Sequence, residues 1–228
     1  MEEKQVRQGS KPVTGRTRDA VILADKAIFR LAKHWLLLAN LFWGLYVGLP
    51  FLAPLMMNAG WTTPARIIYL IYRPACHQRP ERSYFIGGPQ AVYTPEELAA
   101  AGVDLRPLAR DIGNEEIGWK VAFCERDVAI YGSILAAGLA YGALRPVLRN
   151  RARGGGTWKM PFRLFILFAV PMAIDGLAQL FTSYESTWVT RSLTGAIFGI
   201  GAVFFAYPYL EEGMADVRHT VNRKLHLE

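Results

Sequence analysis

The sequence predicts an all-α integral membrane protein with about four transmembrane helices and a long, partly helical outer loop between the first and the second. Hydrophobic residues make up 52% of the 228 residues, which exceeds the usual share in a soluble domain. Several apolar stretches approach the ~20 residues that a helix needs to cross a bilayer. Lys and Arg residues cluster beside these stretches, as they do at membrane surfaces.

The formal net charge of +7 fits a lipid bilayer better than nucleic acid as the partner. Basic residues next to apolar runs indicate anchoring against anionic lipid. The sequence contains no recognisable DNA- or RNA-binding motif, so we expect no nucleic-acid partner.

The first 34 residues are polar and mixed in charge. They lack the apolar core and the small-residue cleavage site of a signal peptide. They predict a cytoplasmic basic tail that leads into an interfacial helix.

Four apolar stretches predict the transmembrane domain, 35–210. The first carries no charge and begins at Trp35. Pro50 and Pro54 predict a kink in it, which neighbouring helices accommodate in a membrane. The predicted spans cover about 35–57, 128–148, 161–181 and 189–210.

The outer loop, 58–127, contains two segments of predictable local structure. The run 65–72, "ARIIYLIY", is too short to span a bilayer. A re-entrant segment, an interfacial segment and the end of a further helix all remain open for it. In "TPEELAAAG", Thr94 and Glu97 form a capping box with Pro95 at the first helical position, which predicts a short helix ending at Gly102.

The distribution of Lys and Arg predicts the orientation. Residues 1–34 contain eight of them, and 145–160 contain five with no acid. The cytoplasmic tail, 211–228, adds three more. These segments belong on the cytoplasmic side of the cell membrane, so both termini are expected inside and the loop outside.

This topology brings the unusual polar residues to one outer-leaflet region. Asp175 lies 14 residues into its span, or roughly 21 Å along the helix. Gln179 follows one turn later on the same face, and Arg191 begins the next span. Because ionisable residues inside a membrane are costly and usually paired, we expect Asp175 to pair with Arg191.

The two cysteines leave three interpretations open. Cys76 and His77 lie in the outer loop, and Cys124 and Asp127 lie at the entrance of the second span. Two thiolates, an imidazole and a carboxylate are an acceptable tetrahedral set for zinc. A Cys76–Cys124 disulfide and a pair of inert cysteines are the alternatives.

The polar motifs resemble those of a family of prokaryotic multi-pass membrane proteins of unknown function. Where the family pattern has a second cysteine in Cys-x-Arg-Cys, this chain has Asp127. The resemblance favours a metal site over a disulfide, because a carboxylate can replace a thiolate as a metal ligand but not as a disulfide partner. The matching residues are Cys76, His77, Gln78, Pro80, Arg82 and Ser83; Cys124, Arg126, Ile130, Tyr131 and Gly132; Asp175, Gly176 and Gln179; and Arg191, Thr194 and Gly195.

The leading functional hypothesis is a zinc-like site that assists hydrolysis or transfer on a small-molecule or lipid-like anionic substrate. Asp175, with Gln179 beside it, is the candidate general base or second acceptor. Arg82, Arg126 and Arg191 are the candidate anion-binding groups. A thiol–disulfide protein linked to a quinone, and a small carrier or channel using Asp175 and Arg191, are the alternatives. Whether the chain is an enzyme, and its oligomeric state, stay open.

Overall fold

The computed structural model describes residues 15–106, 109–151 and 156–225. The predicted fold class is confirmed: within these residues, four helices are long and apolar enough to cross a membrane. Residues 1–14 of the predicted basic tail and interfacial helix, 1–34, lie outside the described residues. The four long helices are α1 (Arg16–Asn58), α4 (Glu125–Arg151), α5 (Phe162–Phe181) and α6 (Trp188–Leu225).

The chain divides into two compact units. The described part of the first unit consists of the start of α1, up to Trp35, and the end of α6, from Glu211. In it, Lys224 Nζ lies 3.1 Å from Asp25 Oδ2, and Phe29 is buried. α1 departs from helical dihedral angles at His34 (φ −109°, ψ 17°). The second unit, 36–210, contains the remaining elements.

The long helices of the second unit expose apolar rather than polar side chains. In α5, Ile174, Leu177 and Leu180 are all exposed, whereas Asp175 is buried. A soluble helix buries its apolar face and exposes its charges. The inverse pattern suits helices whose outer surface is covered by lipid hydrocarbon.

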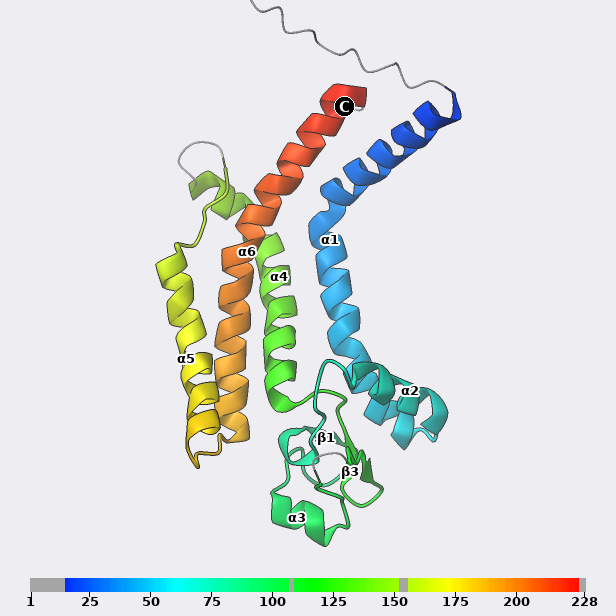
Figure 1. Cartoon of the computed structure of the whole chain (residues 1–228), viewed down its shortest axis with the longest axis vertical. Helices are drawn as coiled ribbons and strands as arrows, with labels where there is room; N and C mark the ends of the chain where they lie inside the picture. Colours follow the sequence, from blue (N-terminus) through cyan, green and yellow to red (C-terminus); the bar gives the residue numbers. More distant parts are fainter. Residues whose placement is uncertain (1–14, 107–108, 152–155, 226–228) are drawn as a thin grey trace, which may run out of the picture. The chain divides into compact units, whose positions relative to one another are not determined.

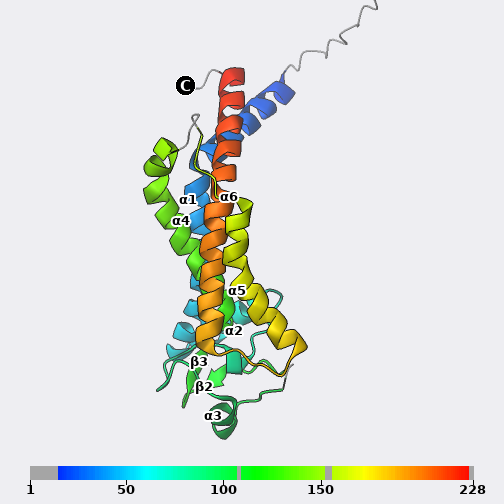
Figure 2. The ribbon, with the colours of Figure 1, turned by 90° about the vertical axis from the view of Figure 1, so that its left-hand side faces the viewer.

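Glycines let the helices α4, α5 and α6 pack closely, and these helices lie side by side in both views (Figures 1 and 2). An added Cβ at Gly199 of α6 would lie 2.5 Å from the backbone oxygen of Ile130 in α4. Gly201, also in α6, meets the side chain of Phe168 in α5. Small residues allow this close approach of backbones in membranes.

The loop between α1 and α4 forms a small folded region. Its three-stranded antiparallel sheet has the order β1-β3-β2 and was not predicted. Gly118 adopts φ +81°, and a Cβ there would lie 2.6 Å from the oxygen of Ile86. The sheet therefore needs glycine at the start of β3. The loop elements are α2 (Thr62–Tyr72), η1 (Pro80–Arg82), β1 (Phe85–Ile86), α3 (Pro95–Ala100), β2 (Gly113–Asn114) and β3 (Gly118–Lys120).

The predicted capping box is confirmed at α3. The Thr94 hydroxyl accepts from the Glu97 backbone N–H at 3.3 Å, and the Glu97 carboxylate accepts from the Thr94 N–H at 2.7 Å. Leu98 of this helix is fully buried in the core of the loop region.

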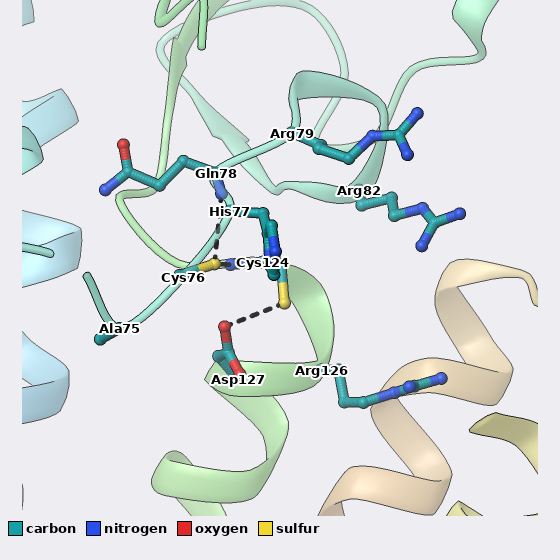
Figure 3. Close-up of a pocket in the computed structure, with 9 residues that line it drawn as sticks. All are labelled: Ala75, Cys76, His77, Gln78, Arg79, Arg82, Cys124, Arg126 and Asp127. Atoms are coloured by element: carbon teal, nitrogen blue, oxygen red, sulfur yellow. Dashed lines mark hydrogen bonds between the residues drawn. The ribbon is translucent and has the colours of Figure 1, made fainter. Parts of the chain in front are cut away.

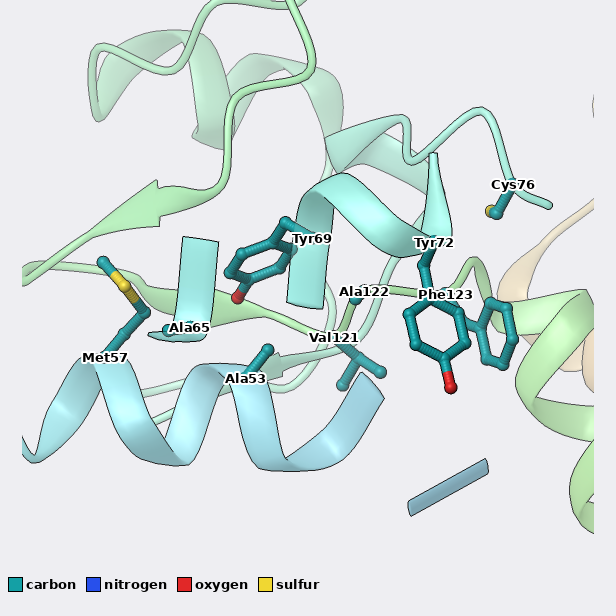
Figure 4. Packing of buried hydrophobic residues seen from close by; sticks show 9 residues of the cluster. All are labelled: Ala53, Met57, Ala65, Tyr69, Tyr72, Cys76, Val121, Ala122 and Phe123. Atoms are coloured by element: carbon teal, nitrogen blue, oxygen red, sulfur yellow. The ribbon is translucent and has the colours of Figure 1, made fainter. Parts of the chain in front are cut away.

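A buried cluster joins the loop to the end of α1 (Figure 4). α2 contributes Tyr69 and Tyr72, and the segment after β3 contributes Phe123. The rings of Tyr72 and Phe123 meet edge to face, with centroids 4.9 Å apart. Cys76 belongs to the same cluster, so packing fixes the segment that carries this thiol.

Candidate functional site

Backbone donors hold the sulfur of Cys76 in place after the end of α2. The N–H of Gln78 donates to Cys76 Sγ at 3.4 Å, and the N–H of Cys124 donates at 3.2 Å. Gln78 has a left-handed φ of 53° and is buried, and its side-chain amide donates to the oxygen of Tyr69. This turn directs the sulfur toward the start of α4.

Lys120 stabilises the same turn through a hydrogen bond to its backbone. Its side chain is fully buried, and Nζ donates to the backbone oxygen of Gln78 at 2.7 Å. Burial lowers the pKa of Lys120 to about 7. Lys120 was not predicted as a site residue, because a lysine in a polar loop is expected to be solvated. The sheet places it in the interior.

Cys124 and Asp127 meet Cys76 at the start of α4. Cys124 immediately precedes the helix, and Asp127 lies in its first turn. Cys124 Sγ donates to Asp127 Oδ2 at 3.1 Å. One ligand atom from each of Cys76, Cys124 and Asp127 lies within 4.8 Å of the other two (Figure 3). Residues 48 positions apart in the sequence thus form one cluster.

The two thiols perturb each other. The proximity of the two sulfurs lowers the pKa of Cys76, whereas the same proximity and burial raise the pKa of Cys124. Both cysteines are free in the structure, so the interpretation as a formed disulfide does not describe this state.

His77 lies beside the cluster but does not join it. Its side chain is exposed and lines the same pocket as the two cysteines. The group of mutually close ligand atoms contains Cys76, Cys124 and Asp127 without His77. The structure thus brings together three of the four predicted metal ligands.

Three arginines line the pocket above the cluster, which has a volume of about 410 Å³ (Figure 3). Arg79 forms an ion pair with Glu81, and Arg126 forms one with Asp175. Arg82 is half-buried, and its guanidinium has no ion pair or hydrogen bond with a described residue. Burial, together with the charges of Arg191 and Arg79, lowers the pKa of Arg82.

The predicted ion pair between Asp175 and Arg191 is wrong. Asp175 pairs with Arg126 of α4, and Arg191 pairs instead with Glu125, with 2.9 Å between Nη1 and Oε2. Gln179 donates to Asp175 Oδ2 at 3.2 Å, one turn away as expected from the spacing. Consecutive residues of α4 therefore bind two different helices.

Arg191 and Glu125 are almost completely buried, with 9% and 1% of their side chains exposed. Arg191 Nε also donates to Ser186 Oγ at 3.1 Å. Glu125 was missed in the sequence, where it stood beside a more conspicuous cysteine and arginine. Its position at the start of an apolar span could have identified it as a candidate, because ionisable residues there are usually paired.

Of the five residues predicted to act on a substrate, only Arg82 and Arg126 line the pocket. Asp175 is buried behind Arg126, and Gln179 hydrogen-bonds to Asp175. Asp175 can orient the guanidinium of Arg126, since a buried carboxylate fixes a bound guanidinium by charge-assisted hydrogen bonds.

Comparisons with known proteins agree with the predicted resemblance. Residues 117–205 match the family described as "Predicted membrane protein (DUF2085)". This range includes Cys124, Asp127, Asp175 and Arg191, and Cys76 precedes it. The chain is also 27% identical over 188 residues to "Uncharacterized protein MJ1492" of Methanocaldococcus jannaschii, covering 80% of this chain and 96% of that protein. No solved structure matches the chain. The resemblance to an uncharacterised membrane protein family is confirmed.

Proposed function

Because the chain resembles a family of membrane proteins, we propose that it is a membrane protein that binds a divalent metal ion through Cys76, Cys124 and Asp127. One observation carries the proposal: these three ligand atoms lie within 4.8 Å of one another. Two thiolates and a carboxylate favour zinc among the biological divalent ions.

The proposed site has three protein ligands, as catalytic zinc sites commonly do. Cys76, Cys124 and Asp127 would hold the ion with each ligand atom about 2.0–2.3 Å from it. The position that these three ligands leave open would be available to water or to His77, which lines the same pocket. A metal-bound water with a lowered pKa would supply hydroxide for hydrolysis or transfer.

The pocket wall favours an anionic group on the substrate. Arg82 faces the pocket without an acid partner among the described residues, and guanidinium groups bind phosphate and carboxylate well. Arg126 lines the same pocket with its partner Asp175 behind it. A small-molecule or lipid-like anion fits this charge, with the pocket on the outer face of the cell membrane and both termini cytoplasmic.

Metal analysis of the purified full chain in detergent tests the proposal. After zinc loading and removal of free metal, we expect about one zinc ion per chain, as for other structural and catalytic sites. Cys76→Ser and Asp127→Asn should each release the zinc. Asp104→Asn is the matched control, because Asp104 pairs with Arg106 elsewhere in the loop. Unchanged zinc in Cys76→Ser, or none in the wild type, would contradict the proposal.

The free thiols favour a second candidate, a dithiol redox protein. Oxidation of Cys76 and Cys124 to a disulfide would release two electrons and two protons to an acceptor such as a quinone. Thiol alkylation of membranes before and after incubation with a quinone distinguishes the two candidates. Thiols that remain alkylatable after the quinone, and that zinc protects, exclude the redox candidate.

The carrier hypothesis receives less support from the geometry. It used Asp175 and Arg191 as groups lining one path, but each residue binds a different partner on α4.

A further inference from the structure

The helix α2 has one buried face and one exposed apolar face, and the proposed metal site does not account for the exposed one. Ala65, Tyr69 and Tyr72 face the buried cluster. At 100° per residue, Ile67, Leu70 and Ile71 lie on the opposite side, and they are 51%, 57% and 64% exposed. A folded loop in water rarely leaves such an apolar face uncovered.

α2 begins where a membrane-spanning helix ends. α1 stops at Asn58 and α2 starts at Thr62. With 11 residues, α2 is about 16 Å long, which is too short to cross the hydrocarbon core of ~30 Å. A short helix with an exposed apolar face beside a transmembrane helix lies in the plane of the interface, its apolar side toward the acyl chains.

An arginine-lined pocket opens on the flank of the same helix. Its volume is about 510 Å³, and Arg66 and Arg73 of α2 line it together with Arg110. Arg66 and Arg73 are exposed, and no acid lies within ion-pair distance of any of the three among the described residues. The pocket therefore offers unpaired positive charge beside the apolar face.

The two acids in the pocket wall do not cancel its positive charge. Asp104 binds Arg106, with 3.0 Å between Oδ1 and Nε, and this contact lowers the pKa of Asp104 to about 2. Asp111 accepts from the N–H groups of Asp104 at 3.1 Å and of Gly113 at 2.9 Å. Asp111 keeps its negative charge, but the pocket wall holds four arginines, Arg66, Arg73, Arg106 and Arg110, against two carboxylates, which leaves a net charge of +2.

We propose that this flank of α2 binds the phosphate of an anionic phospholipid. The phosphate would lie between Arg66, Arg73 and Arg110, because guanidinium groups match phosphate oxygens in charge and geometry. The acyl chains would lie along Ile67, Leu70 and Ile71. Charge in the pocket and apolar side chains beside it together select a phospholipid over a free phosphate. The proposal is independent of the metal site.

Calorimetric titration of the full chain in neutral detergent tests this binding. The probe is a short-chain phosphatidylglycerol, compared with a phosphatidylcholine of the same chains and with glycerol 3-phosphate. We expect saturable binding of the first probe, and at least about tenfold weaker binding of the other two. The choline cation of phosphatidylcholine is repelled by the positive pocket, and glycerol 3-phosphate lacks the apolar contact of the chains.

Three variants separate a defined lipid site from general attraction to the basic chain. Arg66→Gln/Arg73→Gln should weaken phosphatidylglycerol binding at least about tenfold. Arg163→Gln removes an exposed charge at the start of α5 and should leave binding unchanged. Ile67→Ser/Ile71→Ser should weaken binding of the lipid while leaving that of glycerol 3-phosphate unaltered.

Equal losses in the arginine pair and in Arg163→Gln would overturn the proposal by showing unspecific attraction. Glycerol 3-phosphate binding as tightly as the lipid would overturn it in favour of a soluble phosphate ligand. A double arginine variant that keeps the helical circular dichroism and the affinity of the wild type would also refute it.

Discussion

Removing one partner of the buried pair of Glu125 and Arg191 should weaken the contact between α4 and α6 strongly. Their side chains are only 1% and 9% exposed, and the carboxylate accepts from Nη1 at 2.9 Å. Glu125→Gln removes the negative charge with little change in size. It leaves the buried guanidinium of Arg191 without its carboxylate partner.

We expect Glu125→Gln to lower the free energy of unfolding by about 3–5 kcal/mol, the range found when one partner of a buried ion pair is removed. Arg191→Met should cost a similar amount, because it leaves the carboxylate uncompensated. Glu125→Gln/Arg191→Met should cost less than the sum of the single changes, by about 1–3 kcal/mol, since neither charge is then stranded.

The assay is reversible unfolding in mixed micelles at increasing mole fractions of denaturing detergent, followed by circular dichroism. The same cycle on Asp175→Asn and Arg191→Met serves as the control. These two residues do not pair in the structure, so their effects should add within about 0.5 kcal/mol.

The opposite pattern would refute the reasoning. Strong coupling between Asp175 and Arg191, together with additivity between Glu125 and Arg191, would restore the pairing that the sequence suggested and overturn the one in the structure.

Three further predictions concern packing, titration and docking of the loop. Gly199→Val should destabilise the helix bundle by about 1–3 kcal/mol through overpacking, measured in the same unfolding assay, whereas Gly132→Val, with nothing within 4 Å of its added Cβ, should cost less. Burial lowers the pKa of Lys120 from 10.5 to about 7, so between these values the unfolded chain binds a proton that the folded chain does not. The free energy of unfolding should therefore fall as the pH is lowered from about 10 to 7, and this slope should be flatter in Lys120→Met. Tyr84→Phe removes the hydroxyl that lies 2.6 Å from Ser192 Oγ, and it should cost about 0.5–1.5 kcal/mol; no change in the unfolding midpoint would show that this contact does not hold the loop.

The sequence predicted the four long helices well, because an uninterrupted apolar run of this length has few other structures available to it. It also predicted the short helix at 94–102, where capping depends on neighbouring residues alone. The sheet was missed for the opposite reason. Its strands contain two or three residues each, too few for an alternating pattern, and their partners are distant in the sequence.

The candidate site was predicted in composition but not in its contacts. Motifs placed Cys76, Cys124 and Asp127 near one membrane face, and the structure brings them together. The partner of Asp175 could not be predicted, because consecutive residues of a helix point about 100° apart. That rotation sends Glu125 to α6 and Arg126 to α5, and it depends on how the helices pack.

X-ray absorption at the zinc edge of the zinc-loaded full chain tests the central claim most directly. The proposed site predicts two sulfur neighbours at about 2.3 Å, from Cys76 and Cys124, and oxygen or nitrogen neighbours at about 2.0–2.2 Å, from Asp127 and a further ligand. A coordination shell of oxygen and nitrogen without sulfur would contradict the claim that this cluster holds the metal.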